Sequence, residues 1–192
     1  MTTYIPRIST IPYDVFASPS ASILLPIALG TAVGYTTRTK ETYDTIKQPP
    51  LRPPPYVFGP AWTALYGLMG YAAHRVATRA SLPSISSSLS GPAQDLQTLY
   101  SLQLGLNLTW MPLFFGLRRP ALAFANVVSL VGLNGYLTYR YFGIDSVAGW
   151  CMVPYLAWLG FATYLNAGVG YLNGWDISES TLATRKALGK DK

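Results

Sequence analysis

Five long stretches without a charged residue constrain the fold of this 192-residue chain more than any other feature. They contain 23, 22, 22, 20 and 30 residues and are, in order, Val15–Thr37, Pro53–His74, Leu96–Leu117, Pro120–Tyr139 and Ser146–Trp175. A helix needs about 20 mostly apolar residues to cross the hydrocarbon core of a bilayer. The pattern therefore predicts an all-α integral membrane protein, a five-transmembrane-helix bundle whose surroundings are the lipid bilayer.

The scarcity of ionisable residues excludes several classes of function. Charged residues make up 11% of the chain, against roughly 25% in an ordinary soluble domain. All eight acidic residues lie outside the five windows. Ion-coupled carriers keep ionisable groups inside the membrane, so this distribution argues against ion-coupled transport. The single Cys151 excludes an internal disulfide and a multi-thiolate metal site. We therefore expect no metal and no cofactor. We also expect no nucleic-acid partner, because the net charge of +6 belongs to loops and not to a basic patch on a soluble domain.

The expected spans divide the chain into an N-terminal segment of residues 1–20, a membrane domain of residues 21–173 and a basic tail of residues 174–192. The five spans are expected at Ala21–Tyr35, Val57–Ala77, Leu96–Phe115, Ala121–Tyr139 and Val147–Leu172. The loop 36–56 is proline-rich, and because proline fixes φ this loop can hold one shape over the bundle. The Ser-rich stretch 81–93 is expected to be a flexible polar connector.

Lysine and arginine are distributed unequally between the two sides of the predicted bundle. The side with the N-terminus and the second and fourth loops has four of these residues, and the side with the first and third loops and the tail has ten. Because positive loops stay in the cytosol, we expect a cytosolic C-terminus and an N-terminus across the membrane.

Polar and aromatic side chains gather in the predicted cytosolic half of the bundle. The second to fifth spans carry them at helical spacing, and the members of this set are Trp62, Tyr66, Asn107, Trp110, Asn126, Trp158 and Asn166. Gln103 shares the face of Asn107 and Trp110 but lies deeper, and Ala162 and Leu165 share the face of Trp158 and Asn166. Amides in hydrocarbon need partners and therefore face the bundle interior. Two interpretations remain open on spacing alone: a pocket for a large, mostly apolar, planar ligand, or side chains that only pack helices together.

The sequence GTAVG in the first span has the small-xxx-small spacing that lets two helices approach closely. Its glycines, Gly30 and Gly34, fit packing within the bundle and also a homodimer contact, so both readings stay open. Trp150 and Trp175, at the two ends of the last span, are assigned to interfacial belts.

Three motifs carry a resemblance to a known family. They are KQPPLRPPPYVFGPAWTALYGLMGYA, LQLGLNLTWMPLFFG and VPYLAWLGFATYLN, in that order, within about Pro26–Asn173. The chain resembles the translocator protein family, which includes the tryptophan-rich sensory and peripheral-type benzodiazepine receptor proteins. The resemblance implies a five-helix bundle, usually dimeric, that binds porphyrins, sterols and synthetic ligands in the cytosolic half under the first loop.

The resemblance also implies which residues bind the ligand. Trp62 and Trp158 match the two tryptophans that line the family's pocket, and the other matching wall positions are Tyr43, Pro54, Tyr66, Asn107, Trp110, Ala162 and Leu165. The chain departs from the pattern at Thr42 and Leu51, where the family often has tryptophan. Ala167 and Tyr171 replace the tyrosine and arginine of the cholesterol-recognition segment, so that segment is absent.

The interpretation that follows is a translocator or sensor for tetrapyrroles such as protoporphyrin IX. The alternatives are a tryptophan-dependent, photo-oxidative porphyrin-degrading enzyme, and a sterol-handling or scaffold protein. Among the family's membranes, the mitochondrial outer membrane is expected first and the endoplasmic reticulum second, because residues 1–20 resemble neither a cleavable signal nor a presequence.

Overall fold

The computed structural model describes residues 11–37, 43, 45–80 and 83–187, with side chains described outside 83–94 and 185–187. All regular structure in these ranges is helical. The elements are α1 (Tyr13–Ala17), α2 (Pro19–Thr36), α4 (Pro55–Ala80), α5 (Pro83–Met111), the π-helical turn η1 (Pro112–Gly116), α6 (Pro120–Phe142), α7 (Ser146–Leu172) and α8 (Glu179–Ala187). The predicted all-α class is therefore confirmed for the described residues.

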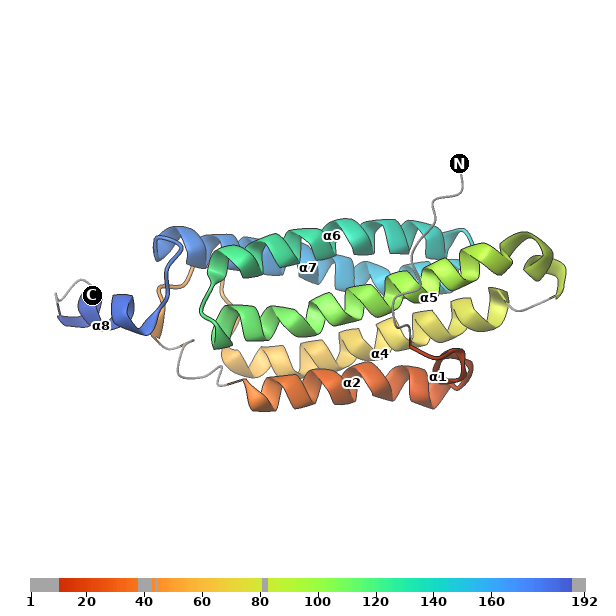
Figure 1. The fold of residues 1–192 in the computed structure, drawn as a ribbon, viewed down its shortest axis with the longest axis horizontal. Helices are drawn as coiled ribbons and strands as arrows, with labels where there is room; N and C mark the ends of the chain where they lie inside the picture. Colours follow the sequence, from red (N-terminus) through yellow and green to blue (C-terminus); the bar gives the residue numbers. More distant parts are fainter. Residues whose placement is uncertain (1–10, 38–42, 44, 81–82, 188–192) are drawn as a thin grey trace.

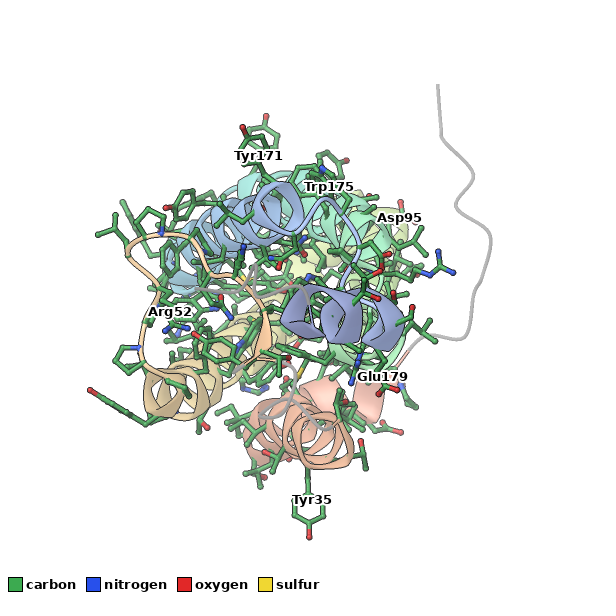
Figure 2. All side chains as sticks on the ribbon, turned by 90° about the vertical axis from the view of Figure 1, so that its left-hand side faces the viewer. Tyr35, Arg52, Asp95, Tyr171, Trp175 and Glu179 are labelled. Atoms are coloured by element: carbon green, nitrogen blue, oxygen red, sulfur yellow. The ribbon has the colours of Figure 1, made fainter. Side chains whose placement is uncertain are left out.

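The five long helices lie side by side and alternate in direction along the chain (Figure 1). One end of the bundle carries the loop that precedes α4, the η1–α6 turn and α8, and we call it the loop end. The opposite end carries α1 and the α6–α7 turn, and we call it the α1 end. Viewed from the loop end, Tyr35 and Tyr171 point away from the bundle (Figure 2).

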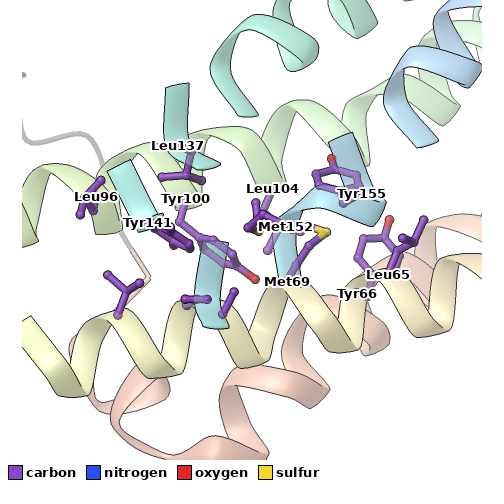
Figure 3. Close-up of a cluster of buried hydrophobic side chains, with 14 of the residues drawn as sticks. Leu65, Tyr66, Met69, Leu96, Tyr100, Leu104, Leu137, Tyr141, Met152 and Tyr155 are labelled. Carbon is purple, nitrogen blue, oxygen red and sulfur yellow. The ribbon is translucent and has the colours of Figure 1, made fainter. Parts of the chain in front are cut away.

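A core of aromatic and aliphatic side chains joins α4, α5, α6 and α7 (Figure 3). Its fully buried members include Met69, Leu104, Leu137, Met152 and Tyr155. Burial of each large side chain stabilises a water-soluble protein by about 1.5–3 kcal/mol. In a bilayer the surrounding lipid is also apolar, so close packing and interhelical hydrogen bonds provide more of the stabilisation.

Small residues bring α2 and α4 into close contact. A Cβ added at Gly30 would overlap the ring of Tyr66 on α4, and one added at Gly70 would overlap the carbonyl oxygen of Ser22 on α2. The Ser22 hydroxyl donates a 2.7 Å hydrogen bond to the Gly70 carbonyl. Gly30 therefore makes its close approach within the chain, and the homodimer stays an untested prediction.

Three helices, α2, α6 and α7, are long and apolar enough by themselves to cross a membrane. The other two long helices have 26 and 29 residues. Both contain uncharged stretches, but α4 is rich in tyrosine and proline and α5 begins with serines, which lowers their mean hydropathy. The all-helical prediction is confirmed, and the count of five spans stays a prediction.

The stretch 83–93 was expected to be a flexible connector, and this expectation is wrong for the backbone. α5 begins at Pro83, so the helix runs through the Ser-rich residues. Proline is favourable in the first turn of a helix, because the amide it lacks would have no partner there. At its other end, α5 continues into η1, where Leu117 N–H donates to Pro112 O at 2.8 Å.

Candidate functional site

Four aromatic rings from α4 and α7 form a cluster in the loop-end half of the bundle. Trp62 contacts Tyr66 one turn along α4, at a centroid distance of 5.2 Å, and contacts Tyr155 and Trp158 of α7 at 6.2 and 6.4 Å. The Trp62 and Trp158 rings meet edge to face, with an interplanar angle of 81°. Such geometry is favourable for aromatic quadrupoles. We call these four residues the aromatic cluster.

Asn107 of α5 connects the two sides of the aromatic cluster. Its Oδ1 accepts a 2.6 Å hydrogen bond from the Tyr66 hydroxyl, and its Nδ2 donates a 2.8 Å bond to the Tyr155 hydroxyl. All three side chains are buried. A buried amide that is fully used in this way fixes the positions of both rings, because an unpaired polar group in an apolar interior is costly.

Trp110, three residues further along α5, belongs to a neighbouring group. Its Nε1 donates to Asn166 Oδ1 at 3.1 Å, and Asn166 Nδ2 donates to the Pro120 carbonyl at 3.0 Å. Its ring stacks on Phe114 with a centroid distance of 5.0 Å. Trp110 therefore ties α5 to α7 and to the start of α6, and the hydrogen bonds do not connect it to the Asn107 network.

The loop before α4 lies against α7. Pro49 packs on Gly168, where an added Cβ would come within 2.6 Å of the proline ring. The Tyr164 hydroxyl donates to Pro50 O at 2.9 Å. Asn173 fixes the same loop, because it accepts from Lys47 N–H and donates to Lys47 O.

An aromatic chain runs from this loop to the aromatic cluster. Tyr43 donates to Pro53 O at 3.1 Å and contacts Phe58, which in turn contacts Trp158 at a centroid distance of 6.0 Å. Phe58 lies one helical turn before Trp62 on α4. The described part of the loop thus reaches the aromatic cluster from the loop end through Tyr43 and Phe58.

The structure brings together most of the predicted site residues. Tyr43, Trp62, Tyr66, Asn107 and Trp158 form one connected group, whereas Trp110 lies in the neighbouring group. Among the remaining positions, Ala162 packs against the main core, Leu165 is half-buried on α7, and Pro54 is exposed beside the start of α4.

Sequence reasoning missed Tyr155, Phe58 and Phe161: Tyr155 contacts Trp62, and Phe58 and Phe161 contact Trp158. Helical spacing carried the signal that could have found them. Tyr155 and Phe161 lie three residues to either side of Trp158 on α7, and Phe58 lies four residues before Trp62, so each shares a face with its tryptophan.

The aromatic cluster and Asn107 together offer aromatic faces, one amide and two hydroxyl groups, and their side chains include no carboxylate or amine. Such a set of groups is typical of sites for apolar molecules that are oriented by a few polar contacts. Within the described parts of the chain, no three His, Cys, Asp or Glu side chains lie together in a way that could hold a metal ion.

The model of the TspO/MBR family matches residues 22–172, which include all five long helices except the first three residues of α2. The chain belongs to the TspO/MBR family. The predicted family is thereby confirmed, and the chain is an integral membrane protein of the translocator and sensory type.

Relatives from three groups of organisms resemble this family member over most of their length. It is 41% identical to the "Translocator protein homolog" of Schizosaccharomyces pombe over 165 residues, 84% of this chain and 98% of that protein. It is 38% identical to the "Tryptophan-rich sensory protein" of Cereibacter sphaeroides, over 77% of this chain and 85% of that protein. With the human "Translocator protein" the identity is 34%, over 69% of this chain and 76% of that protein.

Proposed function

We propose that this family member is a membrane-embedded binding protein, a translocator or sensor, whose ligand is a tetrapyrrole such as protoporphyrin IX or a similar large apolar molecule. The observation that carries the proposal is the aromatic cluster under the loop, in which the Trp62 and Trp158 rings meet edge to face at a centroid distance of 6.4 Å. A planar ligand would part these two rings and stack against them, because indole faces stack favourably on other π-systems. The Tyr66–Asn107–Tyr155 bridge would supply the polar contacts.

We also propose that all five long helices cross the bilayer. Each contains one of the uncharged windows or most of it, and large aromatic side chains are exposed at both ends of the bundle. Tyr35, Tyr56 and Tyr171 are exposed at the loop end, and Tyr139 and Trp150 at the α1 end. Tyrosine and tryptophan are enriched at the two membrane surfaces, so the exposure of these side chains at both ends supports a spanning bundle.

The test of the binding proposal is a titration of protoporphyrin IX into the detergent-solubilised protein, followed by tryptophan fluorescence in the dark. We expect saturable quenching in the wild type. Trp158→Phe should weaken binding by about three- to tenfold, because one aromatic contact contributes about 0.5–1.5 kcal/mol. The matched control is Trp150→Phe, which changes an exposed tryptophan of the same helix at the α1 end and should leave the affinity unchanged.

Quenching that does not saturate, or equal affinities of the two variants, would contradict the proposed site. The same samples distinguish a binder from the photo-oxidative alternative. A binder leaves porphyrin absorbance under light unchanged relative to a Trp62→Phe, Trp158→Phe double variant, whereas the enzyme would lower it in the wild type alone.

Among the membranes that the family occupies, we propose the mitochondrial outer membrane, which an apolar, uncleaved first span without a presequence suits best, with the endoplasmic reticulum as the alternative. Cell fractionation of the tagged protein with markers for both membranes tests the assignment. Co-sedimentation with the marker of the endoplasmic reticulum would contradict the mitochondrial assignment and favour the alternative.

A further inference from the structure

A second polar site lies at the α1 end, at the opposite end of the bundle from the aromatic cluster. It is a cleft of about 180 Å³ on the outer face of α4, and we call it the arginine cleft. It is lined by Tyr71, His74, Arg75, Thr78 and Arg79. The volume corresponds to several water molecules at roughly 30 Å³ each, so a group larger than one water fits.

Two other elements flank the arginine cleft. On one side, His74 Nδ1 lies 2.7 Å from the Phe16 carbonyl of α1, and because a carbonyl only accepts, Nδ1 carries the proton. On the other side, Asp145 in the α6–α7 turn accepts from Arg75 Nη2 and from Arg79 Nε, each at 2.8 Å. α1 and the α6–α7 turn therefore lie on two sides of the cleft, and Asp145 fixes the positions of both arginines.

The acceptor capacity of Asp145 is already used. Its Oδ2 accepts from Arg75 Nε at 3.0 Å as well as from the two nitrogens above, and its Oδ1 accepts from Val147 N–H and Ala148 N–H. One carboxylate thus faces two guanidinium groups. Two further acidic residues, Asp14 on α1 and Asp95 in the first half of α5, belong to the same end, and among the described residues neither forms an ion pair with Arg75 or Arg79.

Donors remain available in the cleft. The terminal nitrogens of Arg79 have no hydrogen-bond partner among the described residues, and half of this side chain is exposed. The Tyr71 hydroxyl accepts from Arg75 Nη1 at 3.1 Å, which leaves its own proton to donate. A concave site with surplus positive charge and free donors is suited to a group that carries negative charge and several acceptor oxygens.

We propose that the arginine cleft binds the phosphate of an anionic phospholipid headgroup. The cleft lies at the end of an uncharged helical window, Pro53–His74, where the headgroup layer meets the protein in the proposed spanning arrangement. Basic pockets of helical bundles at this depth bind anionic headgroups. The planar guanidinium of Arg79 can donate two parallel hydrogen bonds to phosphate oxygens. The site is separate from the aromatic cluster, so either proposal can fail alone.

The test is native mass spectrometry of the full chain in a neutral detergent, titrated with phosphatidylglycerol and, in parallel, with zwitterionic phosphatidylcholine. We expect the wild type to retain phosphatidylglycerol in preference to phosphatidylcholine. Arg79→Gln should weaken phosphatidylglycerol binding about five- to tenfold. Arg79→Lys, which keeps the charge but loses the paired guanidinium donors, should weaken binding less than Arg79→Gln, and circular dichroism checks that both variants are folded.

The matched control is Arg140→Gln at the same end of the bundle. Arg140 donates to Tyr136 one turn earlier on α6, as Arg75 does to Tyr71, but among the described residues it has no ion pair and does not line the arginine cleft. Equal losses for Arg79→Gln and Arg140→Gln, or no loss for Arg79→Gln, would overturn the proposal. Displacement of phosphatidylglycerol by millimolar inorganic phosphate would overturn the lipid assignment in favour of a soluble anion.

Discussion

Asn107 is the residue on which the geometry of the aromatic cluster depends. Asn107→Leu removes the partner of two buried tyrosine hydroxyls, and leaving such groups unpaired costs about 1–3 kcal/mol each. We expect a clear fall in the unfolding temperature in detergent, measured by circular dichroism, together with weaker porphyrin quenching.

Gln103, one turn earlier on α5, provides the matched control for Asn107. Its side chain is fully buried, and its amide has no hydrogen-bond partner within the described part of the chain. Gln103→Leu should leave the unfolding temperature unchanged or raise it, because an apolar side chain replaces an amide that makes no hydrogen bond there. A larger loss for Gln103→Leu than for Asn107→Leu would contradict the assigned roles.

Asp145 should make the stability of the protein depend on acid. Burial opposes ionisation of its carboxyl group, but hydrogen bonds from Arg75 and from the Ala148 and Val147 amides outweigh burial and lower its pKa below the ordinary 3.8. The stabilisation is therefore complete well above pH 4 and is lost as the pH falls through the lowered folded-state pKa.

Asp145→Asn isolates this effect, because asparagine keeps the helix cap and removes the charge. At pH 7 the variant should unfold at a lower temperature than the wild type, and the gap should narrow as the pH falls below about 4. Thermal unfolding at pH 7, 5 and 3.5 measures it. A difference in unfolding temperature between the two proteins that stays constant over this pH range would show that the ion pairs of Asp145 do not contribute to stability.

At the scale of helices, the α2–α4 contact connects the outer helix of the bundle to the aromatic cluster. Gly30→Ala places a methyl group against the Tyr66 ring, which must then shift from the position in which its hydroxyl donates to Asn107. Overpacking of this kind costs about 1–3 kcal/mol. Gly34→Ala is the control from the same motif, since its nearest atom, Met111 Cε, is 4.0 Å away. We expect Gly30→Ala alone to lower the unfolding temperature, and equal effects would contradict the contact.

Helices were predictable from the sequence because a charge cannot be placed in lipid cheaply, so the uncharged windows record where long helices lie. Their ends were less predictable. Residues 83–93 have a polar composition that suits a connector, yet they extend α5 beyond the expected start at Leu96. Composition indicates whether a segment lies in water or in lipid, but it does not indicate where the helix ends.

Side-chain partners across helices were the least predictable part of the site. Spacing along one helix placed Trp62 with Tyr66 and Trp158 with Ala162, because residues four apart share a face. It could not show that Asn107 joins Tyr66 to Tyr155 while Trp110, on nearly the same face of α5, turns to Asn166. Those choices depend on how α4, α5 and α7 rotate against each other. The position of Pro49 on Gly168 depends on the fold in the same way.

For the whole molecule, the sidedness of charge predicts one orientation. The loop end carries the first loop, the third loop and the tail, which together hold ten of the 14 lysines and arginines, and such loops stay in the cytosol. Single cysteines in a Cys151→Ala background test this prediction. Thr184→Cys reports on α8, Ala17→Cys on α1, and Ser81→Cys on the junction between α4 and α5.

In sealed vesicles with the cytosolic face outward, a membrane-impermeant maleimide should label Thr184→Cys directly. It should label Ala17→Cys and Ser81→Cys only after permeabilisation, because an odd number of spans separates each of them from the tail. Protection of Ala17→Cys together with free labelling of Ser81→Cys would mean that α4 and α5 do not cross the bilayer. The reverse pattern at all three positions would show that the protein has the opposite orientation, with the arginine cleft on the cytosolic side.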